Sequence, residues 1–255
     1  MECITSRSNP LITHIRKLTG SKTARRQAGE MVCEGPKMLE EALKCGAEVT
    51  TVVAERGTVL PGGLPKKIRS VEVPSDLLHA IAPTQTPQNL LFLCTIPTTE
   101  PPEGLPQGRY LVLDGLQDPG NVGTIWRTAD ALGADGVFLL GACADPWGPK
   151  TLRATMGACF RLPLWELRLA DLLPLLKGAG IPLYATALRE DTVDVRQADL
   201  SVCALVIGSE GRGLSQEVLA ACASTLKIPM RPRCESLNAA AAAAVILWEM
   251  ARLNG

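Results

Sequence analysis

Apolar positions in the first hundred residues follow two spacings, one typical of helices and one typical of buried strands. After Ser8-Asn9-Pro10, the side chains of Leu11, Ile15 and Leu18 recur at helical intervals, which predicts a first helix near 8–20. Further patterns predict strands at 30–33, 49–54 and 89–96 and helices at 35–45 and 75–81, the last helix beginning at a serine cap. Together these elements predict a small α/β domain.

Beyond residue 108 the two patterns alternate regularly. Apolar runs predict strands at 110–113, 136–140, 182–187, 203–207 and 225–229. Helical spacing predicts helices at 121–132, 148–157, 170–179, 215–223 and 237–252. Strands that alternate with helices indicate a mostly parallel sheet with helices on both faces.

A segment rich in proline and glycine separates the two patterns. Pro101, Pro102 and Pro106 stand close to Gly104 and Gly108, and this composition holds neither a helix nor a central strand. We therefore predict an N-terminal domain over 1–97, a linker over 98–108 and a second domain over 109–255.

Composition indicates what to expect of membrane association, cellular location and metal binding. No basic segment followed by an apolar one opens the chain, and no run approaches the ~20 apolar residues that a membrane span needs, so we expect no membrane partner. The nine cysteines are odd in number and include no C-x-x-C pair, which predicts a reducing, cytoplasmic location. The two histidines stand at no zinc-ligand spacing from a cysteine pair, so we expect no metal site.

The distribution of charge is more informative than its total. The chain has 26 basic and 26 acidic residues, a balance that disfavours a protein coating nucleic acid. Within residues 1–29, however, Glu2 is the only acid beside six basic residues, which are Arg7, Arg16, Lys17, Lys22, Arg25 and Arg26. Such a cluster attracts phosphate groups. A solvated helix face with flexible arginines is the alternative interpretation.

Candidate chemistry begins after the strand at 110–113. Gly115, Gly120 and Gly123 follow it with four and two intervening residues, whereas the dinucleotide fingerprint needs one and two, so a nicotinamide site is disfavoured. Asn121 is placed to cap the next helix. Arg127 follows within that helix, and its structural role would be a salt bridge to Asp130 or a neighbouring acid.

Two later segments have the residues of a ligand site. Gly208 to Ser215 holds three glycines directly after the strand that ends at Ile207, and glycine lets a backbone approach a ligand closely. Glu210, within this loop, is suited to bind a ligand or to brace the loop. Ser236, Leu237 and Asn238 precede an alanine-rich helix, at a position suited to capping and to binding anions.

Three segments together carry a family resemblance: DGLQDPGNVGTIWRTA at 114–129, GSEGRGLS at 208–215, and IPM at 228–230 followed by ESLN at 235–238. In this order they resemble the motifs of the SpoU (TrmH-type) RNA 2'-O-ribose methyltransferases, a branch of the SPOUT superfamily. The similarity spans 109–252. Residues 5–96 resemble the small substrate-binding domain of the longer ribosomal-RNA members, mainly through Ser8-Asn9-Pro10 and Glu34-Gly35.

The resemblance implies an α/β domain with a C-terminal trefoil knot, S-adenosylmethionine as methyl donor, and a homodimer that binds RNA, with 23S ribosomal RNA as the expected substrate. It places the donor against Ile207, Gly208, Ile228 and Leu237, with Glu210 and Asn238 lining the pocket. It places Asn121, Arg127 and Ser236 on the acceptor side. For Arg127, the resemblance permits a general base, and we favour a group that orients the ribose, because a guanidinium keeps its proton in proteins.

One departure from the family pattern follows Asn238. The family usually has a Val-Ser-Val-like triplet there, and this chain has Ala239-Ala240-Ala241. The lost hydroxyl at 240 would alter the acceptor pocket or the dimer packing. Two alternatives to a ribosomal-RNA enzyme follow from the sequence: a transfer-RNA 2'-O-methyltransferase, and a non-catalytic RNA-binding or ribosome-assembly protein on the same fold.

Overall fold

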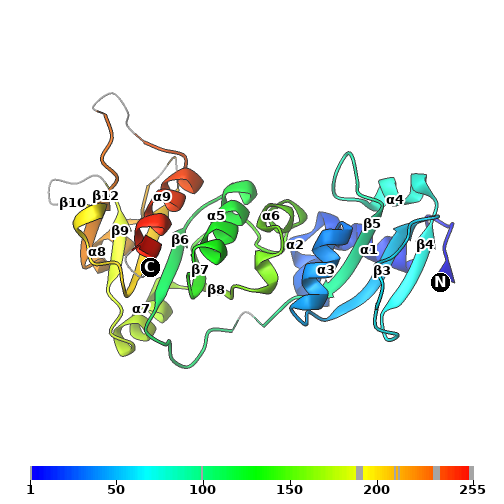
Figure 1. The fold of residues 1–255 in the computed structure, drawn as a ribbon, viewed down its shortest axis with the longest axis horizontal. Coiled ribbons are helices and arrows are strands. Elements are labelled where there is room, and N and C mark those ends of the chain that lie inside the picture. Colours follow the sequence, from blue (N-terminus) through cyan, green and yellow to red (C-terminus); the bar gives the residue numbers. More distant parts are fainter. Residues whose placement is uncertain are drawn as a thin grey trace. The chain divides into compact units, whose positions relative to one another are not determined.

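The chain folds into two compact units. The computed structural model describes residues 2–98, 100–187, 192–209, 211, 213–231 and 236–252. Unit 1 comprises Met1–Thr98 and Asp145–Phe160, and unit 2 comprises Thr99–Ala144 and Arg161–Gly255 (Figure 1). Residues 145–160 therefore lie between two segments of unit 2 in the sequence but belong to unit 1 in the fold.

Unit 1 contains a five-stranded sheet in the order β1-β4-β3-β5-β2. Strands β1, β4 and β3 run parallel, and β5 runs antiparallel to both β3 and β2. The elements are β1 (Glu2–Cys3), α1 (Pro10–Gly20), α2 (Lys22–Ala28), β2 (Glu30–Glu34), α3 (Pro36–Lys44), β3 (Val49–Glu55), β4 (Arg69–Val73), α4 (Ser75–Ile81), β5 (Leu90–Thr95), α6 (Pro149–Thr155) and a 3₁₀ turn, η1 (Ala158–Phe160).

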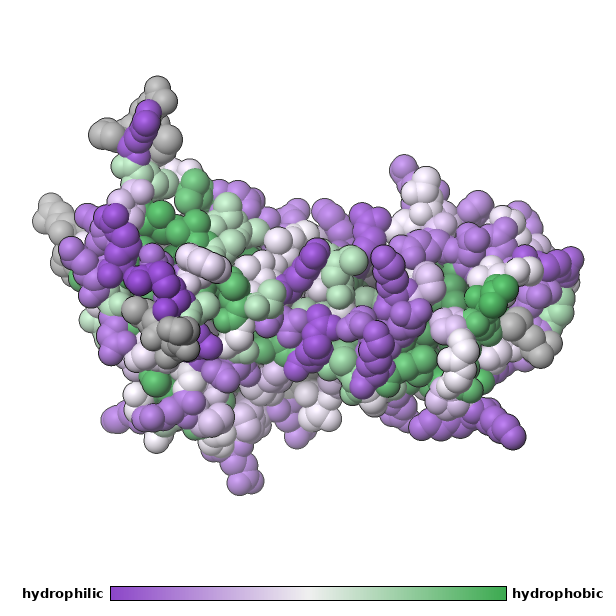
Figure 2. All heavy atoms as spheres, in the orientation of Figure 1, coloured by the Kyte–Doolittle hydropathy of each residue, from purple (hydrophilic) through white to green (hydrophobic). Residues whose placement is uncertain are grey.

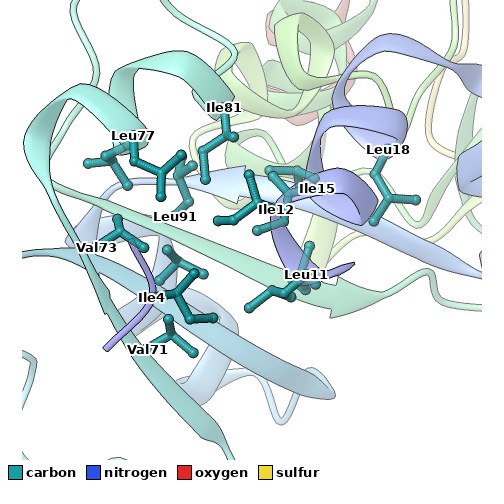
Figure 3. Close-up of a cluster of buried hydrophobic side chains, with 14 residues drawn as sticks. Ile4, Leu11, Ile12, Ile15, Leu18, Val71, Val73, Leu77, Ile81 and Leu91 are labelled. Atoms are coloured by element: carbon teal, nitrogen blue, oxygen red, sulfur yellow. The ribbon is translucent and has the colours of Figure 1, made fainter. Parts of the chain in front are cut away.

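The core of unit 1 lies between its sheet and two helices. Ile12 and Ile15 of α1 meet Leu77 and Ile81 of α4 over the apolar face of the strands (Figure 3). The first helix is confirmed: Asn9 accepts a hydrogen bond from the Leu11 N–H at 2.9 Å, and Pro10 occupies its first turn. The predicted serine cap of α4 is wrong, because Ser75 is already helical and Pro74 precedes it.

Unit 2 contains a seven-stranded, wholly parallel sheet in the order β10-β12-β9-β11-β6-β7-β8. This confirms the predicted α/β class. The elements are β6 (Arg109–Asp114), α5 (Pro119–Ala131), β7 (Gly136–Leu140), β8 (Leu164–Leu167), α7 (Leu169–Gly178), β9 (Leu183–Thr186), β10 (Val193–Asp194), η2 (Val195–Gln197), β11 (Cys203–Gly208), α8 (Gln216–Ala221), β12 (Ser224–Lys227) and α9 (Ala239–Arg252). The knot implied by the resemblance stays a prediction.

The alanine-rich helix α9 packs against α5 of its own unit. Ala239, Ala240 and Ala243 are buried, because small side chains let two helix backbones approach closely. Within the part of the chain that is described, no helix is both long and apolar enough to cross a membrane.

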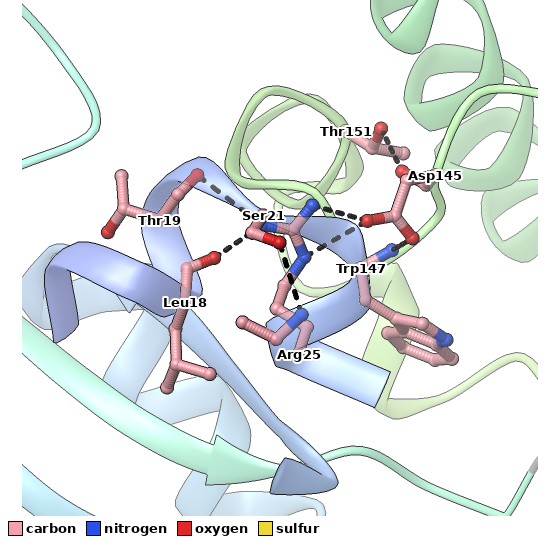
Figure 4. A network of polar contacts seen from close by, with 8 residues as sticks. Leu18, Thr19, Ser21, Arg25, Asp145, Trp147 and Thr151 are labelled. Atoms are coloured by element: carbon pink, nitrogen blue, oxygen red, sulfur yellow. Dashed lines mark hydrogen bonds and ion pairs between the residues drawn. The ribbon is translucent and has the colours of Figure 1, made fainter. Parts of the chain in front are cut away.

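A buried ion pair fixes the 145–160 segment within unit 1 (Figure 4). The Arg25 guanidinium donates to Asp145 Oδ2, with Nε at 3.0 Å, and also donates to the Leu18 carbonyl oxygen. Asp145 in turn accepts from the Trp147 N–H through Oδ1 and from the Thr151 hydroxyl through its carbonyl oxygen. Arg25, one member of the basic N-terminal cluster, is thus structural and inaccessible to phosphate.

Candidate active site

A cavity of about 300 Å³ lies where the carboxyl ends of three neighbouring strands meet. Thr186, Gly208 and Lys227 end β9, β11 and β12, and all three line it. Parallel strands bring their carboxyl ends to one edge of a sheet, which is where ligands bind in α/β proteins. The predicted residues that line the cavity are Ile207, Gly208, Ile228, Ser236 and Leu237. Further lining residues come from the loop after β12 and from α9, including Met230, Ala239, Ala242 and Ile246.

The glycine-rich loop after β11 closes on itself at the wall of this cavity. Ser209 and Gly213 form an antiparallel bridge, with hydrogen bonds of 3.2 and 2.8 Å between their backbones. Gly213 has φ of +66°, and a Cβ on Gly208 would lie 2.7 Å from the Gly213 carbonyl carbon. The packing of the loop therefore requires glycine at position 208. From the sequence, we attributed this glycine only to the close approach of a ligand.

The same loop is held at its far end by the strand of the first motif. Asp114, the last residue of β6, accepts a hydrogen bond from the Ser215 backbone N–H at 2.9 Å through Oδ2. The Ser215 hydroxyl in turn accepts from the Val218 N–H and caps α8. Asp114 was not among the predicted site residues, although its position at a strand end was a signal for it. Burial raises the pKa of the nearby Cys143 thiol.

The helix of the first motif begins at Pro119, two residues earlier than predicted. Asp118, rather than Asn121, caps α5: its Oδ1 accepts from the Asn121 N–H at 2.9 Å, and Pro119 occupies the first helical position. Relieved of the capping role, the Asn121 side chain accepts through Oδ1 a hydrogen bond of 3.2 Å from Asn238 Nδ2. The first and third motifs therefore meet through their carboxamides.

Asn238 has a second function at the start of α9. Its Oδ1 accepts hydrogen bonds from the backbone N–H groups of Ala240 and Ala241, at 3.0 and 3.3 Å, and so caps the helix as predicted. One carboxamide thus fixes the helix start with its oxygen and contacts Asn121 with its nitrogen. Ala240, at the departure from the family pattern, is buried and does not line the cavity.

Arg127 lies on the exposed side of α5. Its predicted structural partner is engaged elsewhere, since Asp130 pairs with Arg161 at 2.7 Å. Among the described residues, none forms a hydrogen bond or ion pair with the Arg127 side chain. Of the predicted acceptor residues, Ser236 lines the cavity, whereas Asn121 and Arg127 do not. Asn238, predicted on the donor side, does not line it either. The predicted residue Glu210 lies outside the described residues.

Comparisons with known proteins cover both parts of the chain. The model of the SpoU rRNA methylase family matches residues 108–248, and that of the MRM3-like substrate binding domain matches residues 9–91. Over 251 residues the chain is 33% identical to the 23S rRNA (guanosine(2553)-2'-O)-methyltransferase RlmP of Bacillus subtilis, covering 98% of this chain and 99% of that protein.

Two solved structures of relatives contain the methyl donor. The AdoMet-bound rRNA methyltransferase from Sinorhizobium meliloti is 31% identical and covers 99% of this chain and 98% of its own, with a TM-score of 0.86. The SpoU methyltransferase AviRb from Streptomyces viridochromogenes, in complex with AdoMet, is 30% identical and covers 96% of this chain and 98% of its own, with a TM-score of 0.85. The similarity extends over both units.

Proposed function

This chain belongs to the SpoU rRNA methylase family, and we propose that it transfers a methyl group from S-adenosylmethionine to a ribose 2'-hydroxyl of 23S ribosomal RNA. One observation carries the proposal: the second and third motifs converge on one cavity at the carboxyl edge of the parallel sheet. Relatives of the same fold were solved with AdoMet bound.

The cavity suits this donor in size and in lining. Its volume of about 300 Å³ falls at the lower end of small-molecule sites, ~300–1,000 Å³. Ile207, Ile228 and Leu237 supply apolar contact for the adenine and the methionine chain. Backbone groups at Gly208 and Ser209 supply polar contacts, and Glu210 and Asn238 complete the donor side. S-adenosylmethionine brings a methyl group already activated on its sulfonium.

The acceptor ribose is oriented by Asn121, Arg127 and Ser236. Methyl transfer needs the ribose oxygen in line with the methyl carbon, and such positioning contributes ~7–11 kcal/mol to lowering a barrier. Because a guanidinium keeps its proton in proteins, Arg127 acts by orienting the ribose or its phosphate and by stabilising the alkoxide that develops on the 2'-oxygen. Its exposed position, with Asp130 paired to Arg161, leaves the guanidinium available to RNA.

Ribosomal RNA is favoured over transfer RNA by unit 1. Residues 9–91 match a substrate binding domain, and the RlmP relative, named for a 23S rRNA position, is similar over 98% of this chain. We propose a substrate-binding domain over 1–97, a linker over 98–108 and a methyltransferase domain over 109–255, of which residues 145–160 belong to unit 1 in the fold. The eight described cysteines form no disulfide with one another, which suits a cytoplasmic location.

The enzyme acts as a homodimer through α9. Ala241, Val245 and Trp248 recur at helical spacing on its exposed side, and Val245 and Trp248 are 41% and 62% exposed. Hydrophobic side chains emerge over this helix in Figure 2. An apolar stripe of this kind fits a self-complementary surface between two copies. Trp248→Glu should yield monomers in sedimentation experiments, whereas an unchanged mass would contradict this assignment.

Calorimetric titration with S-adenosylmethionine, followed by tritiated-methyl transfer to total ribosomal RNA and total transfer RNA, tests the proposal. We expect donor binding and label in ribosomal RNA. Label in transfer RNA alone would show that transfer RNA, and not ribosomal RNA, is the substrate. A folded protein that binds no donor and labels neither pool would be a non-catalytic RNA-binding protein, an alternative that the altered triplet at 239–241 permits.

A further inference from the structure

The basic cluster near the N-terminus divides into two groups in the structure. Arg25 is buried and pairs with Asp145, and Arg7 pairs with Asp76 at 2.9 Å. The other members of the cluster are exposed on two consecutive helices: Arg16 and Lys17 of α1, and Lys22 and Arg26 of α2. We call these four residues the basic surface. None of them lines the cavity proposed for the donor.

The two helices that carry the basic surface are tied to each other. Ser21 alone joins them: its N–H donates to the Lys17 carbonyl oxygen at 3.0 Å at the end of α1, and its hydroxyl caps α2. Arg25 of α2 reaches back to the end of α1 and donates to the carbonyl oxygens of Leu18 and Thr19 (Figure 4). The cations on either side of Ser21 are therefore held on one folded unit rather than on separate, independent helices.

No acid of the two helices balances these charges, because neither α1 nor α2 contains an aspartate or a glutamate. Two carboxylates reach the helices from elsewhere in unit 1, and both are engaged. Asp145 accepts from the buried Arg25, and Glu30 contacts His14 at 2.7 Å. Among the described residues, no hydrogen bond or ion pair is formed by the side chains of three of the four cations, which are Arg16, Lys17 and Lys22.

The placement of the cations disfavours the helix that carries them. Lys22 lies in the first turn of α2, where the helix dipole repels a cation, and Arg26 follows four residues later on the same side. Helix α3 of the same unit is the contrast: Lys37 and Glu41 stand four residues apart, and Glu41 pairs with Lys44 at 3.1 Å. Residues that break a local rule of stability are expected at functional sites. The basic surface therefore indicates an anionic partner.

RNA phosphates fit this surface better than a lipid surface does. A helix that lies on a membrane needs an apolar face for the acyl boundary. The apolar face of α1 is already buried in the core of unit 1 through Leu11, Ile12, Ile15 and Leu18 (Figure 3). Exposed cations without an apolar face match the phosphates of an RNA backbone. The model of the substrate binding domain begins at residue 9 and covers both helices.

We propose that the basic surface binds backbone phosphates of the RNA substrate, with Arg16, Lys17 and Lys22 as contacting cations. The assignment rests on the proposed function, because it takes the partner to be the RNA that the enzyme modifies. Phosphate contacts strengthen the binding of RNA of any sequence and do not select the nucleotide. Arg25 is a positioning residue for this surface, since its pair with Asp145 holds α2 in place.

A double variant, Lys17→Gln with Lys22→Gln, tests the surface in the whole chain. Both positions are exposed and glutamine suits a helix, so the fold and the unfolding temperature should be preserved. Each lost phosphate contact lowers the slope of log affinity against log salt by ~0.7–0.9, so the double variant should lose about 1.4–1.8. Its affinity for ribosomal RNA should be roughly 10–30-fold weaker at ~0.15 M salt and should equal that of the parent near ~1 M salt.

The control removes the same charge from α3. Lys37→Gln with Lys44→Gln changes two exposed lysines of the same unit that stand beside acids. Its salt slope should stay within about 0.5 of the parent slope. Equal losses in the two double variants would show a general effect of net charge and would overturn the assignment to α1 and α2.

RNA affinity is measured by filter binding without methyl donor, so that it is read separately from methyl transfer. In transfer assays the Lys17→Gln, Lys22→Gln variant should show a raised KM for RNA, with parental turnover at saturating RNA and parental affinity for S-adenosylmethionine. If the parent binds ribosomal RNA but transfers no methyl group, the proposed function fails and the surface is still tested.

Two results would overturn the assignment. The first is a parent protein that does not bind ribosomal RNA at ~0.05 M salt, where phosphate contacts are strongest. The second is a salt slope of the Lys17→Gln, Lys22→Gln variant equal to that of the parent. The four cations would then be an ordinary solvated helix face, or a surface for an acidic protein.

Discussion

Asn238 donates a hydrogen bond of 3.2 Å from its side-chain nitrogen to the side-chain oxygen of Asn121, a residue 117 positions earlier in the chain. The same Asn238 caps α9 through its oxygen, while Asp118 caps α5. The two carboxamides therefore join the starts of two helices at the carboxyl edge of the sheet. Through this contact the first and third sequence motifs touch each other.

Asn238→Asp separates the two functions of this side chain. Aspartate caps helices as well as asparagine does, but its carboxylate cannot donate to Asn121. We expect stability within about 0.5 kcal/mol of the parent in thermal unfolding, with methyl transfer reduced at least tenfold. Asn238→Ala should lose activity and also about 1 kcal/mol of the free energy of unfolding, because it removes the cap too. Full activity of Asn238→Asp would show that a hydrogen-bond donor at position 238 is dispensable.

Arg127→Ala should reduce transfer strongly and leave stability unchanged. The side chain is exposed and has no partner among the described residues, so its removal should change the free energy of unfolding by less than about 0.5 kcal/mol. Loss of a group that stabilises a developing oxyanion costs ~10²–10³ in turnover. Single-turnover assays check this. Arg168→Ala, at another exposed arginine of unit 2, should keep parental activity, and equal losses in the two variants would remove the assignment.

Asp114→Ala should weaken donor binding. Asp114 holds the Ser215 N–H at the end of the glycine-rich loop, and that loop lines the cavity proposed for the donor. We expect an affinity for S-adenosylmethionine about tenfold lower by calorimetry, equivalent to ~1.4 kcal/mol. Asp114→Asn retains an acceptor oxygen and should recover most of the affinity. If Asp114→Asn and Asp114→Ala had the same affinity for S-adenosylmethionine, the Asp114 carboxylate would support donor binding by a route other than its hydrogen bond to Ser215.

Gly208 and Gly211 form a matched pair within the same loop. A Cβ at Gly208 would lie 2.7 Å from the backbone of Gly213, whereas a Cβ at Gly211 would meet nothing within 4 Å. Gly208→Ala should therefore distort the wall of the cavity and weaken donor binding at least fivefold, and Gly211→Ala should bind as the parent does. Unchanged affinity in a folded Gly208→Ala protein would remove this residue from the site.

Arg25→Ala should destabilise unit 1. The Arg25 and Asp145 side chains are 6% and 13% exposed, and removal of one member leaves a buried charge without its partner. Such a loss costs ~3–5 kcal/mol, which should appear as a lower denaturation midpoint. Arg16→Ala, at an exposed position of α1, is the control and should have little effect. A midpoint equal to that of the control would contradict a structural role for the pair.

The periodic parts of the chain were predictable, and the long-range contacts were not. Leu11, Ile15 and Leu18 indicate α1 by spacing alone, and alternating strands and helices indicate the parallel sheet. Short or polar strands escaped prediction; in β4, for example, three of the five side chains are not buried. The start of α5 was misplaced although Pro119 after Asp118 is a recognised sign of a first helical turn.

Contacts between distant residues lie beyond any local pattern. Arg25 reads as a solvated cation until Asp145, 120 positions later, is seen beside it. Asp114 likewise has no sequence neighbour that predicts its bond to Ser215. The motif residues were recognisable because their types and order are specific. Only the structure shows which motif residues line the cavity and which lie on the exposed face of α5.

The most direct test of the central claim is the position of the transferred methyl group. The parent protein is incubated with unmodified 23S ribosomal RNA and S-adenosylmethionine carrying an isotopic methyl label, and the nucleosides are analysed by mass spectrometry, with Arg127→Ala alongside. We predict label on the ribose of a single nucleotide, as a 2'-O-methyl nucleoside, and little or none with the variant. Label on a base, or equal ribose labelling by the variant, would contradict the account.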